Sequence, residues 1–151
     1  MTTAESKGFG KPDEVREFPK GRVELIQIGG ATVGRAVFQP GWRWSTSLKP
    51  IAKTESCQAP HFGYLVSGVL GTRMDDGTEF EARAGDVALI PPGHDGWVVG
   101  DEPAVLIDFQ GMVDYAKTLR TAPDRSSVRR PSASGERAPL TRTARQVRVA
   151  G

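Results

Sequence analysis

The chain has 151 residues, 38% of them hydrophobic, and its 18 glycines and 11 prolines favour a turn-rich β domain over a helical bundle. A single cysteine excludes an internal disulfide framework, no run of about 18 apolar residues is present to span a membrane, and the polar N-terminus lacks a signal peptide, so we expect a cytoplasmic protein. The net charge of +2 describes neither part of the chain, because residues 1–115 carry 11 basic and 16 acidic side chains and residues 116–151 carry 9 basic and 2 acidic ones.

Residues 1–20 form a polar N-terminal extension, in which PDEVREF predicts one helical turn or a clasp. After the extension, short apolar runs alternate with Gly, Pro and Asp. In EFEAR, Phe80 and Ala82 fall on one face and the three charged side chains on the other. Short, evenly spaced strands of this kind indicate an all-β sandwich or barrel. Strands are predicted over residues 22–28, 31–38, 64–74, 79–83, 87–90, 97–99 and 104–109.

The strand pattern stops near residue 112. VDYAKTLR then predicts a short helix, and the Arg-, Ser- and Pro-rich sequence after it predicts a disordered basic tail with too few apolar side chains to offset the entropy of ordering. The expected organisation is an extension over 1–20, a barrel over 21–112, and a helix with a tail over 113–151. The tail could attract an acidic partner, but it lacks interleaved aromatic residues, so nucleic-acid binding is not expected.

Two glycine-bounded patterns point to a family. Gly85 is followed by five residues and then by Pro91, Pro92 and Gly93, and Gly68 closes the run YLVSG. These positions resemble the second motif of the cupin superfamily, G-x5-P-x-G-x2-H-x3-N, and the end of the first, G-x5-H-x-H-x3,4-E-x6-G. The barrel segment is similar to a bacterial group of single-domain cupins, mostly of unassigned function. The resemblance implies a jelly-roll β-barrel that encloses a ligand cavity, and a homodimer that pairs through its sheets.

The metal-binding positions of those motifs hold other residues in this chain. His61 stands where the family has its Glu, Cys57 stands in place of the second His, and Glu55 in place of the first. In the second motif His94 directly follows the motif glycine, and the position expected to be His is Gly96. A shuffled set, Glu55, Cys57, His61 and His94, therefore replaces the usual three His and one Glu.

One thiolate, two imidazoles and one carboxylate form a plausible four-coordinate site for zinc or iron, with manganese and nickel as further candidates. Glu55, Cys57 and His61 share parity, so in one extended strand they would face the same side, although Pro60 interrupts that strand. A bound metal would hold Cys57 as a thiolate. The alternative is a metal-free segment in which Cys57 is buried as a small hydrophobe and each His is simply hydrogen-bonded.

A ligand pocket is also expected, since small barrels commonly hold one small ligand. Arg43 or His94 would anchor its polar groups, although Arg43 has the opposite parity to its flanking tryptophans and is equally expected on the surface. Asp95 would either orient the His94 imidazole or cap its own turn. The predicted binding residues are Trp42, Trp44, Gln58, Tyr64 and Trp97, while core packing is the competing role for the tryptophans.

The chain contains no phosphate-binding loop, dinucleotide fingerprint, serine-nucleophile elbow or Cys-x-x-Cys pair, so ATP, NAD and serine-hydrolase chemistry find no support. The sequence instead predicts a cupin that binds a small organic molecule, with a divalent metal and an oxygenase or isomerase activity. The alternative is a metal-free small-molecule-binding or sensory cupin without catalysis. A third reading is an interaction module whose basic tail binds an acidic partner.

Overall fold

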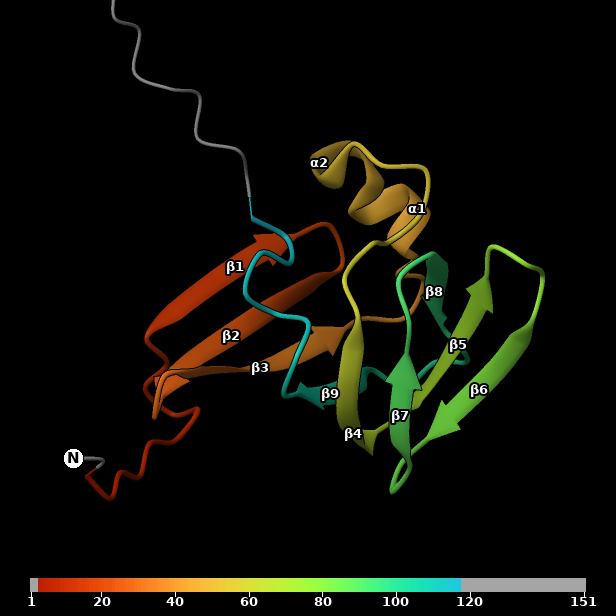
Figure 1. Ribbon diagram of the computed structural model, residues 1–151. Coiled ribbons are helices and arrows are strands. Elements are labelled where there is room, and N and C mark those ends of the chain that lie inside the picture. The colour runs from red at the N-terminus through yellow and green to blue at the C-terminus, as the bar shows by residue number, and fades with distance from the viewer. Residues whose placement is uncertain (1–2, 118–151) are drawn as a thin grey trace, which may run out of the picture. The chain divides into compact units, whose positions relative to one another are not determined.

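The computed structural model describes residues 3–117, which form nine β-strands and two single-turn helices (Figure 1). In chain order these are β1 (Glu14–Phe18), β2 (Gly21–Ile28), β3 (Ala31–Phe38), α1 (Trp44–Ser47), α2 (Lys49–Ala52), β4 (His61–Ser67), β5 (Val69–Met74), β6 (Glu79–Arg83), β7 (Val87–Ile90), β8 (His94–Val98) and β9 (Ala104–Asp108). Neither helix in this part of the chain is long and apolar enough to cross a membrane. The predicted basic tail and the end of the predicted helix lie outside the described residues, and residues 113–117 form turns and bends.

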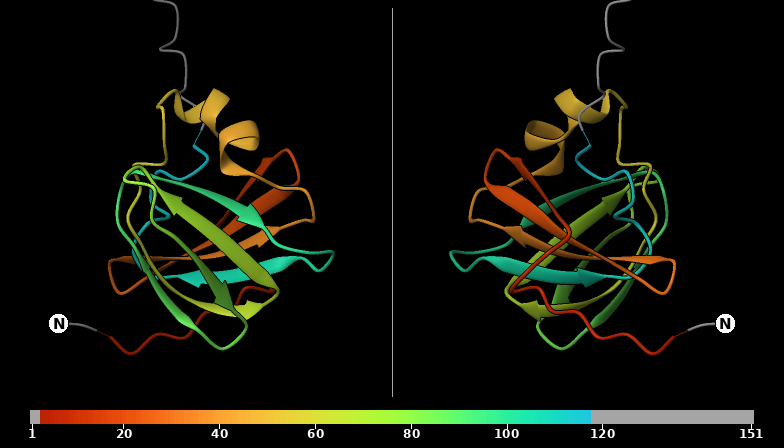
Figure 2. Two further views of the ribbon diagram at one scale, coloured as in Figure 1. Left: turned by 90° about the vertical axis from the view of Figure 1, so that its right-hand side faces the viewer. Right: turned by 90° about the vertical axis from the view of Figure 1, so that its left-hand side faces the viewer.

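The strands pair antiparallel in two sheets. The larger sheet has six strands in the order β1-β2-β3-β9-β4-β7, and the smaller has three in the order β6-β5-β8. Buried side chains from both sheets fill one core, and Figure 2 shows the sheets wrapped around this interior. The predicted all-β, jelly-roll architecture is confirmed.

Two of the four crossings that the described residues make between the sheets lie at Gly68 and Gly93. Gly68 alone separates β4 from β5; its φ is 75°, and a Cβ there would collide with the backbone of Pro103 and Ala104. Gly93 lies between β7 and β8 with a φ of 90°. The crossing at Gly93 places His94 at the first position of β8, on its buried face.

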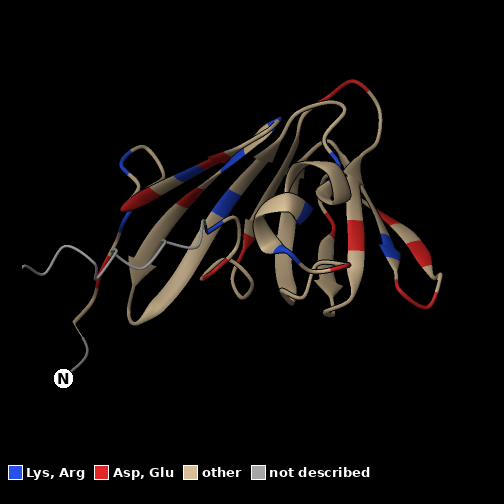
Figure 3. Cartoon of the chain, turned by 90° about the horizontal axis from the view of Figure 1, so that it is seen from above, with Lys and Arg blue, Asp and Glu red and all other residues tan. Residues whose placement is uncertain are grey.

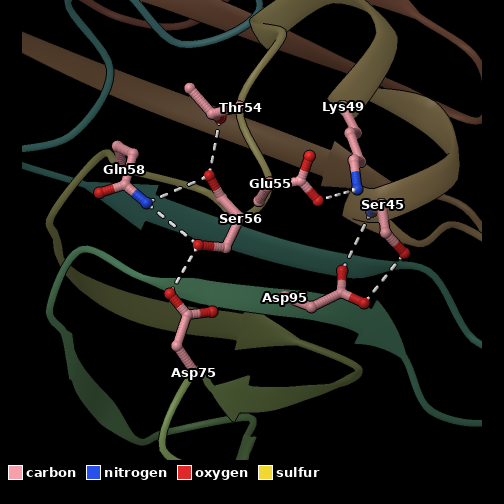
Figure 4. A network of polar contacts seen from close by, with 8 residues as sticks. All are labelled: Ser45, Lys49, Thr54, Glu55, Ser56, Gln58, Asp75 and Asp95. Carbon is pink, nitrogen blue, oxygen red and sulfur yellow. Dashed lines mark hydrogen bonds and ion pairs between the residues drawn. The ribbon is translucent and has the colours of Figure 1, made fainter.

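Three local features differ from the sequence prediction. Residues 14–18 form the edge strand β1, paired with β2, instead of a helical turn. The run over 64–74 is two strands in different sheets, because the chain turns at Gly68. Helices α1 and α2 were not predicted from the sequence. The carboxylate that accepts a hydrogen bond from the first turn of α1 belongs to a strand far away in the chain. Asp95 of β8 accepts hydrogen bonds from the Ser45 backbone N–H at 3.0 Å and from its hydroxyl at 2.9 Å (Figure 4).

Residues 3–13, here called the strap, run along the outer face of β2 and β3. The Arg35 guanidinium lies 5.0 Å from the centroid of the Phe9 ring. On β2, Glu24 and Ile26 alternate with inward-facing core residues and therefore point outward. They are nevertheless only 5% and 4% exposed. Glu24 pairs with Arg22 and Arg35, and Phe9 of the strap lies against the same Arg35, so the arginines and the strap together cover this half of the outer face.

The outer face at β4 and β7 has no comparable cover among the described residues. The register sets Phe62 opposite Leu89 and Tyr64 opposite Val87. Strands β4 and β7 carry no Lys, Arg, Asp or Glu, whereas β1, β2, β3 and β6 do (Figure 3). This surface, here called the apolar face, consists of six side chains that are 44% to 67% exposed: Phe62, Tyr64, Val66, Val87, Leu89 and Phe109.

Candidate metal centre

A small cavity lies between the two sheets. The volume open to the centre of a water-sized sphere is about 20 Å³, and about 10–15 Å³ suffices for one water molecule. Its wall is mostly aromatic and aliphatic, and every lining residue is buried. The lining residues are Phe38, Trp42, Trp44, His61, Leu70, Thr72, Ile90, His94, Gly96, Leu106, Met112 and Tyr115.

Cys57, His61 and His94 come together beside this cavity, with one ligand atom from each lying within 4.8 Å of the others. The Cys57 Sγ is 3.7 Å from His61 Nε2, and the two imidazoles meet edge to face with centroids 5.3 Å apart. No member of the group is more than 5% exposed. Because His61 opens β4 and His94 opens β8, the group bridges the two sheets.

The remaining ring nitrogens of both histidines are engaged by groups outside the cluster. His61 Nδ1 lies 2.5 Å from the Asp108 carboxylate, and His94 Nδ1 donates to the Pro91 carbonyl at 2.7 Å. A carbonyl can only accept, so a neutral His94 carries its proton on Nδ1 and keeps a lone pair on Nε2. A carboxylate imposes the same tautomer on neutral His61. Metal-ligating histidines commonly make such outer hydrogen bonds.

Asp108 is itself fixed in place at the end of β9. It is fully buried, and its second carboxylate oxygen accepts from the backbone N–H groups of Gln110 at 2.8 Å and Gly111 at 2.9 Å. Gly111 approaches so closely that a Cβ would collide with the His61 ring and the Pro60 carbonyl. Asp108 therefore has little freedom, and it restricts the His61 ring in turn.

Cys57 is positioned by a backbone bridge to the other ligand segment. Its N–H donates to the His94 carbonyl at 2.8 Å, and the Gly93 N–H donates to the Cys57 carbonyl at 2.7 Å. The adjacent Ser56 hydroxyl donates to the Asp75 carboxylate at 2.8 Å (Figure 4). The Asp75 N–H also donates to the Gly93 carbonyl at 2.9 Å. Asp75 thus ties both ligand segments together.

The electrostatics of the group favour a thiolate beside an imidazolium. Burial raises the pKa of the Cys57 thiol, but hydrogen bonds and charges from His61 and His94 outweigh it and lower the pKa to about 6. Burial lowers the pKa of His61, but Asp108 and Cys57 together raise it to about 9. Despite burial, His61 and two backbone N–H groups lower the pKa of the Asp108 carboxyl. Without a metal, Cys57 and His61 therefore form an ion pair near neutral pH.

Solved structures similar to this chain include a sugar phosphate isomerase of the cupin superfamily from Silicibacter pomeroyi, with 19% identity over 67% of this chain and 74% of that chain and a TM-score of 0.47. A protein of unknown function from Acidithiobacillus ferrooxidans has 17% identity over 64% and 85% of the two chains and a TM-score of 0.47. A cupin-like protein from Thermotoga maritima has 20% identity over 62% and 69% and a TM-score of 0.43. No protein-family model and no curated protein matches the chain.

The arrangement of the chain itself decides the architecture. Two antiparallel sheets enclose the site, His61 and His94 each open a strand, and Gly68 and Gly93 make the sheet crossings at the motif positions. The chain has a cupin-type fold. A fold of this kind hosts many functions, so the activity of this chain has to be argued from its site.

The three clustered side chains fit a divalent metal by their chemistry. A thiolate with two imidazoles is a donor set that zinc accepts, and iron and nickel accept imidazole and thiolate as well. Manganese prefers oxygen donors and fits least. Three protein ligands also leave a coordination position for water or a substrate, as in catalytic rather than structural zinc sites.

The predicted fourth ligand, Glu55, is not part of the group. Its side chain is 97% exposed and pairs with Lys49 at 2.9 Å (Figure 4). The parity argument assumed one extended strand from residue 55 to residue 61, but β4 begins only at His61 and the backbone of Lys53 is left-handed, with a φ of 56°. The structure therefore corrects the set to Cys57, His61 and His94.

Two of the five predicted binding residues line the cavity. Trp42 and Trp44 are each 3% exposed and form part of the wall. Tyr64 lies on the apolar face, outside the cavity, because its parity on β4 is opposite to that of the buried residues. Gln58 is exposed and donates to the Ser56 hydroxyl at 3.0 Å (Figure 4).

Trp97, the fifth, also lies outside the cavity lining. The Arg43 guanidinium sits 4.7 Å from the Trp97 ring centroid and pairs with Asp95 at 2.9 Å. Arg43 is thus the surface residue that its parity indicated. Asp95 bonds to Arg43 and Ser45, and it has no hydrogen bond to the His94 ring.

Sequence reasoning missed Asp108 and the C-terminal wall of the cavity. Asp108 shares parity with Ala104 and Leu106, so an acidic residue on the buried face of an apolar strand was a signal that could have identified it. Tyr115 packs edge-on against His61 with ring centroids 5.4 Å apart. Nothing in the sequence near Tyr115 indicates this contact.

Proposed function

We propose that this cupin binds a divalent metal ion through Cys57, His61 and His94 and uses it to bind and transform a small organic molecule. The pair of outer hydrogen bonds carries the proposal: Asp108 and the Pro91 carbonyl each engage an Nδ1 atom, which leaves both Nε2 atoms for a metal. A buried group of this kind, beside a largely apolar cavity, meets the usual requirement that a metal site be dry and shaped.

The cavity wall supports a reaction of the oxygenase or isomerase type on a small, largely apolar molecule. When bound, the metal would supply Lewis-acid or redox chemistry. The chain's own contribution is to exclude water with the Phe38, Trp42 and Trp44 side chains and to hold the His61 proton on Nδ1 against Asp108. We place this activity in the cytoplasm, where a free thiol such as Cys57 stays reduced.

A metal-free ligand-binding cupin is the alternative function. The ion pair between Cys57 and His61 favours it, because the two side chains satisfy each other without a metal. In that case the cavity would hold a ligand but perform no chemistry.

Elemental analysis of protein purified without an affinity tag tests the metal. We expect about one metal ion per chain in the wild type, and loss of it in the double variant Cys57→Ser/His61→Ala. Glu55→Ala is the matched control, because this fully solvated carboxylate lies in the same segment and should be dispensable. Full metal content in the double variant would remove these residues from the site. A metal-free wild type, grown with zinc, iron and nickel, would favour the alternative.

A second variant tests the outer hydrogen bond. Asp108→Asn keeps the size of the side chain but weakens its hold on the His61 Nδ1 proton, and such changes typically cost about 10–100-fold in metal affinity. Competition with a chromophoric chelator measures that affinity. Unchanged affinity would mean that Asp108 is merely a buried structural group.

We further propose that two copies of this cupin form a homodimer through the apolar face. On a half-covered strand the outward positions are usually polar, yet on β4 they are Phe62, Tyr64 and Val66. Patches of several hundred Å² rarely stay uncovered on monomers. A two-fold axis would bring the same patch of each copy together.

The other occupant available within this chain is residues 118–151, which contain no Phe, Trp or Tyr. The arginines of that segment would have to lie over an apolar surface without any acidic partner on β4 or β7. The apolar face of a second copy is a better match than this arginine-containing segment, because apolar side chains would then meet apolar side chains. Truncation after residue 117 separates the two cases, because a dimer would survive it and a covering tail would be lost.

A further inference from the structure

The cavity has a volume of about 20 Å³ open to the centre of a water-sized sphere, which is room for about one water molecule and too little for an organic molecule. Part of the wall must therefore move before a ligand can enter. We propose that residues 111–117 form a lid over the cavity and that Arg16 is its latch. The inference rests on the proposed function, since it takes the cavity as the binding place, but its test needs no metal.

Arg16 holds the lid by three backbone carbonyls. Its Nη1 donates to Met112 at 3.1 Å and to Tyr115 at 2.8 Å, and its Nη2 donates to Val113 at 2.9 Å. The guanidinium is oriented from the other side by Glu14, whose carboxylate accepts from Nε at 2.9 Å and from Nη2 at 3.1 Å. The Arg16 side chain is only 9% exposed, and its bonds to the Met112 and Tyr115 carbonyls are partly buried. An Arg fork suits this task because its donors are rigid and diverge.

The lid has few other backbone attachments. The strands that form most of the wall are held by ladder hydrogen bonds, whereas beyond Gly111 the lid has one described backbone bond, from the Lys117 N–H to the Asp114 carbonyl, within the lid itself. Apart from Arg16, the lid is held down by two side chains. Met112 packs against Gly34 of β3, where a Cβ would collide with it, and Tyr115 packs against the core. Segments with few backbone bonds open more readily than strands.

Both of these side chains are part of the cavity wall, so opening the lid opens the cavity. Met112 and Tyr115 are 0% and 7% exposed and line the cavity together with His61. The Tyr115 ring covers one edge of the His61 ring. Gly111, held to Asp108 by its N–H, is a natural pivot, because the hydrogen bonds before it can persist while the residues after it swing away.

Helix α1 is the competing entrance, because its Trp44 also lines the cavity. It is anchored more fully, by its own backbone bonds and by Asp95, which accepts from the Ser45 N–H, the Ser45 hydroxyl and Arg43. Asp95→Asn loosens this wall without touching the lid. It therefore serves as the comparison arm of the test.

Cys57 supplies a built-in probe of access, because it is the only cysteine and lies behind the wall. Full-length protein stripped with a chelator is exposed to iodoacetamide, and alkylation is followed by intact mass, with the denatured chain as reference. We expect Arg16→Ala to speed alkylation at least about tenfold, and Arg16→Lys, with a single donor group, to speed it less. Arg73→Ala, which removes a 62% exposed arginine from β5, should leave the rate unchanged.

Global unfolding is distinguished from lid opening by low urea. Alkylation through local opening is nearly independent of urea, whereas alkylation through global unfolding rises steeply because much more surface is exposed. If Arg16→Ala fails to fold, Arg16→Lys carries the test. Unchanged alkylation in the folded Arg16 variants, or faster alkylation in Asp95→Asn alone, would overturn the proposal. Both results are readable even if the chain binds no metal, so a failure of the lid and a failure of the metal site are separate outcomes.

Discussion

The two halves of the outer face of the six-stranded sheet differ in their exposure to solvent. At β2 and β3 the strap covers the sheet, and Ile26 is 4% exposed. At β4 and β7 equally apolar positions are open, and Leu89 is 67% exposed. The sheet is the same, and what differs is whether a segment of the chain lies over it. Exposure here reflects a missing cover rather than a polar surface.

The sequences of the strands reflect the same difference. In β2 four consecutive residues, Val23 to Ile26, are buried, as in a strand covered on both faces. In β4 burial alternates, although its outward side chains, Phe62, Tyr64 and Val66, are more apolar than those of β2, which include Arg22 and Glu24. The composition of β4 is therefore that of a strand covered on both faces, which is the basis of the proposed homodimer.

The largest expected effect comes from placing a lysine under the strap. Ile26→Lys replaces a covered side chain by a charge without a partner and should lower the free energy of unfolding by about 3 kcal/mol. Leu89→Lys makes the same chemical change on the apolar face and should cost less than about 0.5 kcal/mol at low protein concentration. Denaturant titration of both variants measures the contrast. Equal losses would mean that the two halves do not differ in cover.

The next effect concerns association. Leu89→Lys should weaken the homodimer at least about tenfold, because an interfacial side chain of this size is a candidate hot spot and the lysine would be buried against its own copy. Sedimentation equilibrium measures the dissociation constant. Val15→Lys is the matched control, since Val15 is 49% exposed on β1, away from the apolar face. A monomeric wild type would remove the homodimer.

A smaller loss is expected inside the strap. Phe9→Ala removes the ring under the Arg35 guanidinium and should lower the free energy of unfolding by about 1 kcal/mol. The association of two copies should not change, because the ring lies on the covered half. A stability loss accompanied by weaker association would show that the halves are coupled. Denaturant titration gives the free energy of unfolding, and sedimentation equilibrium of the same sample gives the dissociation constant of the homodimer.

The smallest effect is a pH dependence at the end of the strap. The hydrogen bond from the Gln27 backbone N–H and the one from Lys7 hold the pKa of Asp13 below its usual value of 3.8. A lowered carboxyl pKa contributes stability at higher pH, and that contribution is lost as the pH falls below 3.8 through the folded-state pKa. The Gln27 amide signal in NMR should report the loss in acid. Asp13→Asn should abolish its titration, and a signal that still titrates would assign the effect to another group.

Much of the fold was predictable because it rests on local signals. The strand EFEAR, the glycines at 68 and 93 and the proline turn before β8 are each marked by a few neighbouring residues. The helices at 44–52 have no such local signal in the sequence. The Ser45 N–H in the first turn of α1 donates a hydrogen bond to Asp95, about fifty residues away in the chain.

The candidate site was predictable only in part, for the same reason. Cys57, His61 and His94 lie in two motif segments and were identified from them. Glu55 was assigned by its motif position and supported by a parity that holds only within a regular strand, but its segment is irregular and its side chain is exposed. Asp108 enters the site through the pairing of β9 with β4, a register that no short stretch of sequence specifies.

The spacing of the ligands along the chain sets the order in which the site can be assembled. Cys57 and His61 are 4 residues apart, so little chain entropy is lost when their side chains meet. Asp108 follows His61 by 47 residues, so bringing these two together closes a much longer loop. During synthesis from the ribosome, the thiol and the first imidazole are available long before the rest. A metal ion met at that stage would be held by two ligands only. The complete set of three ligands requires the three crossings of the chain between the sheets that separate β4 from β8, so metal loading would be coupled to a late step of folding.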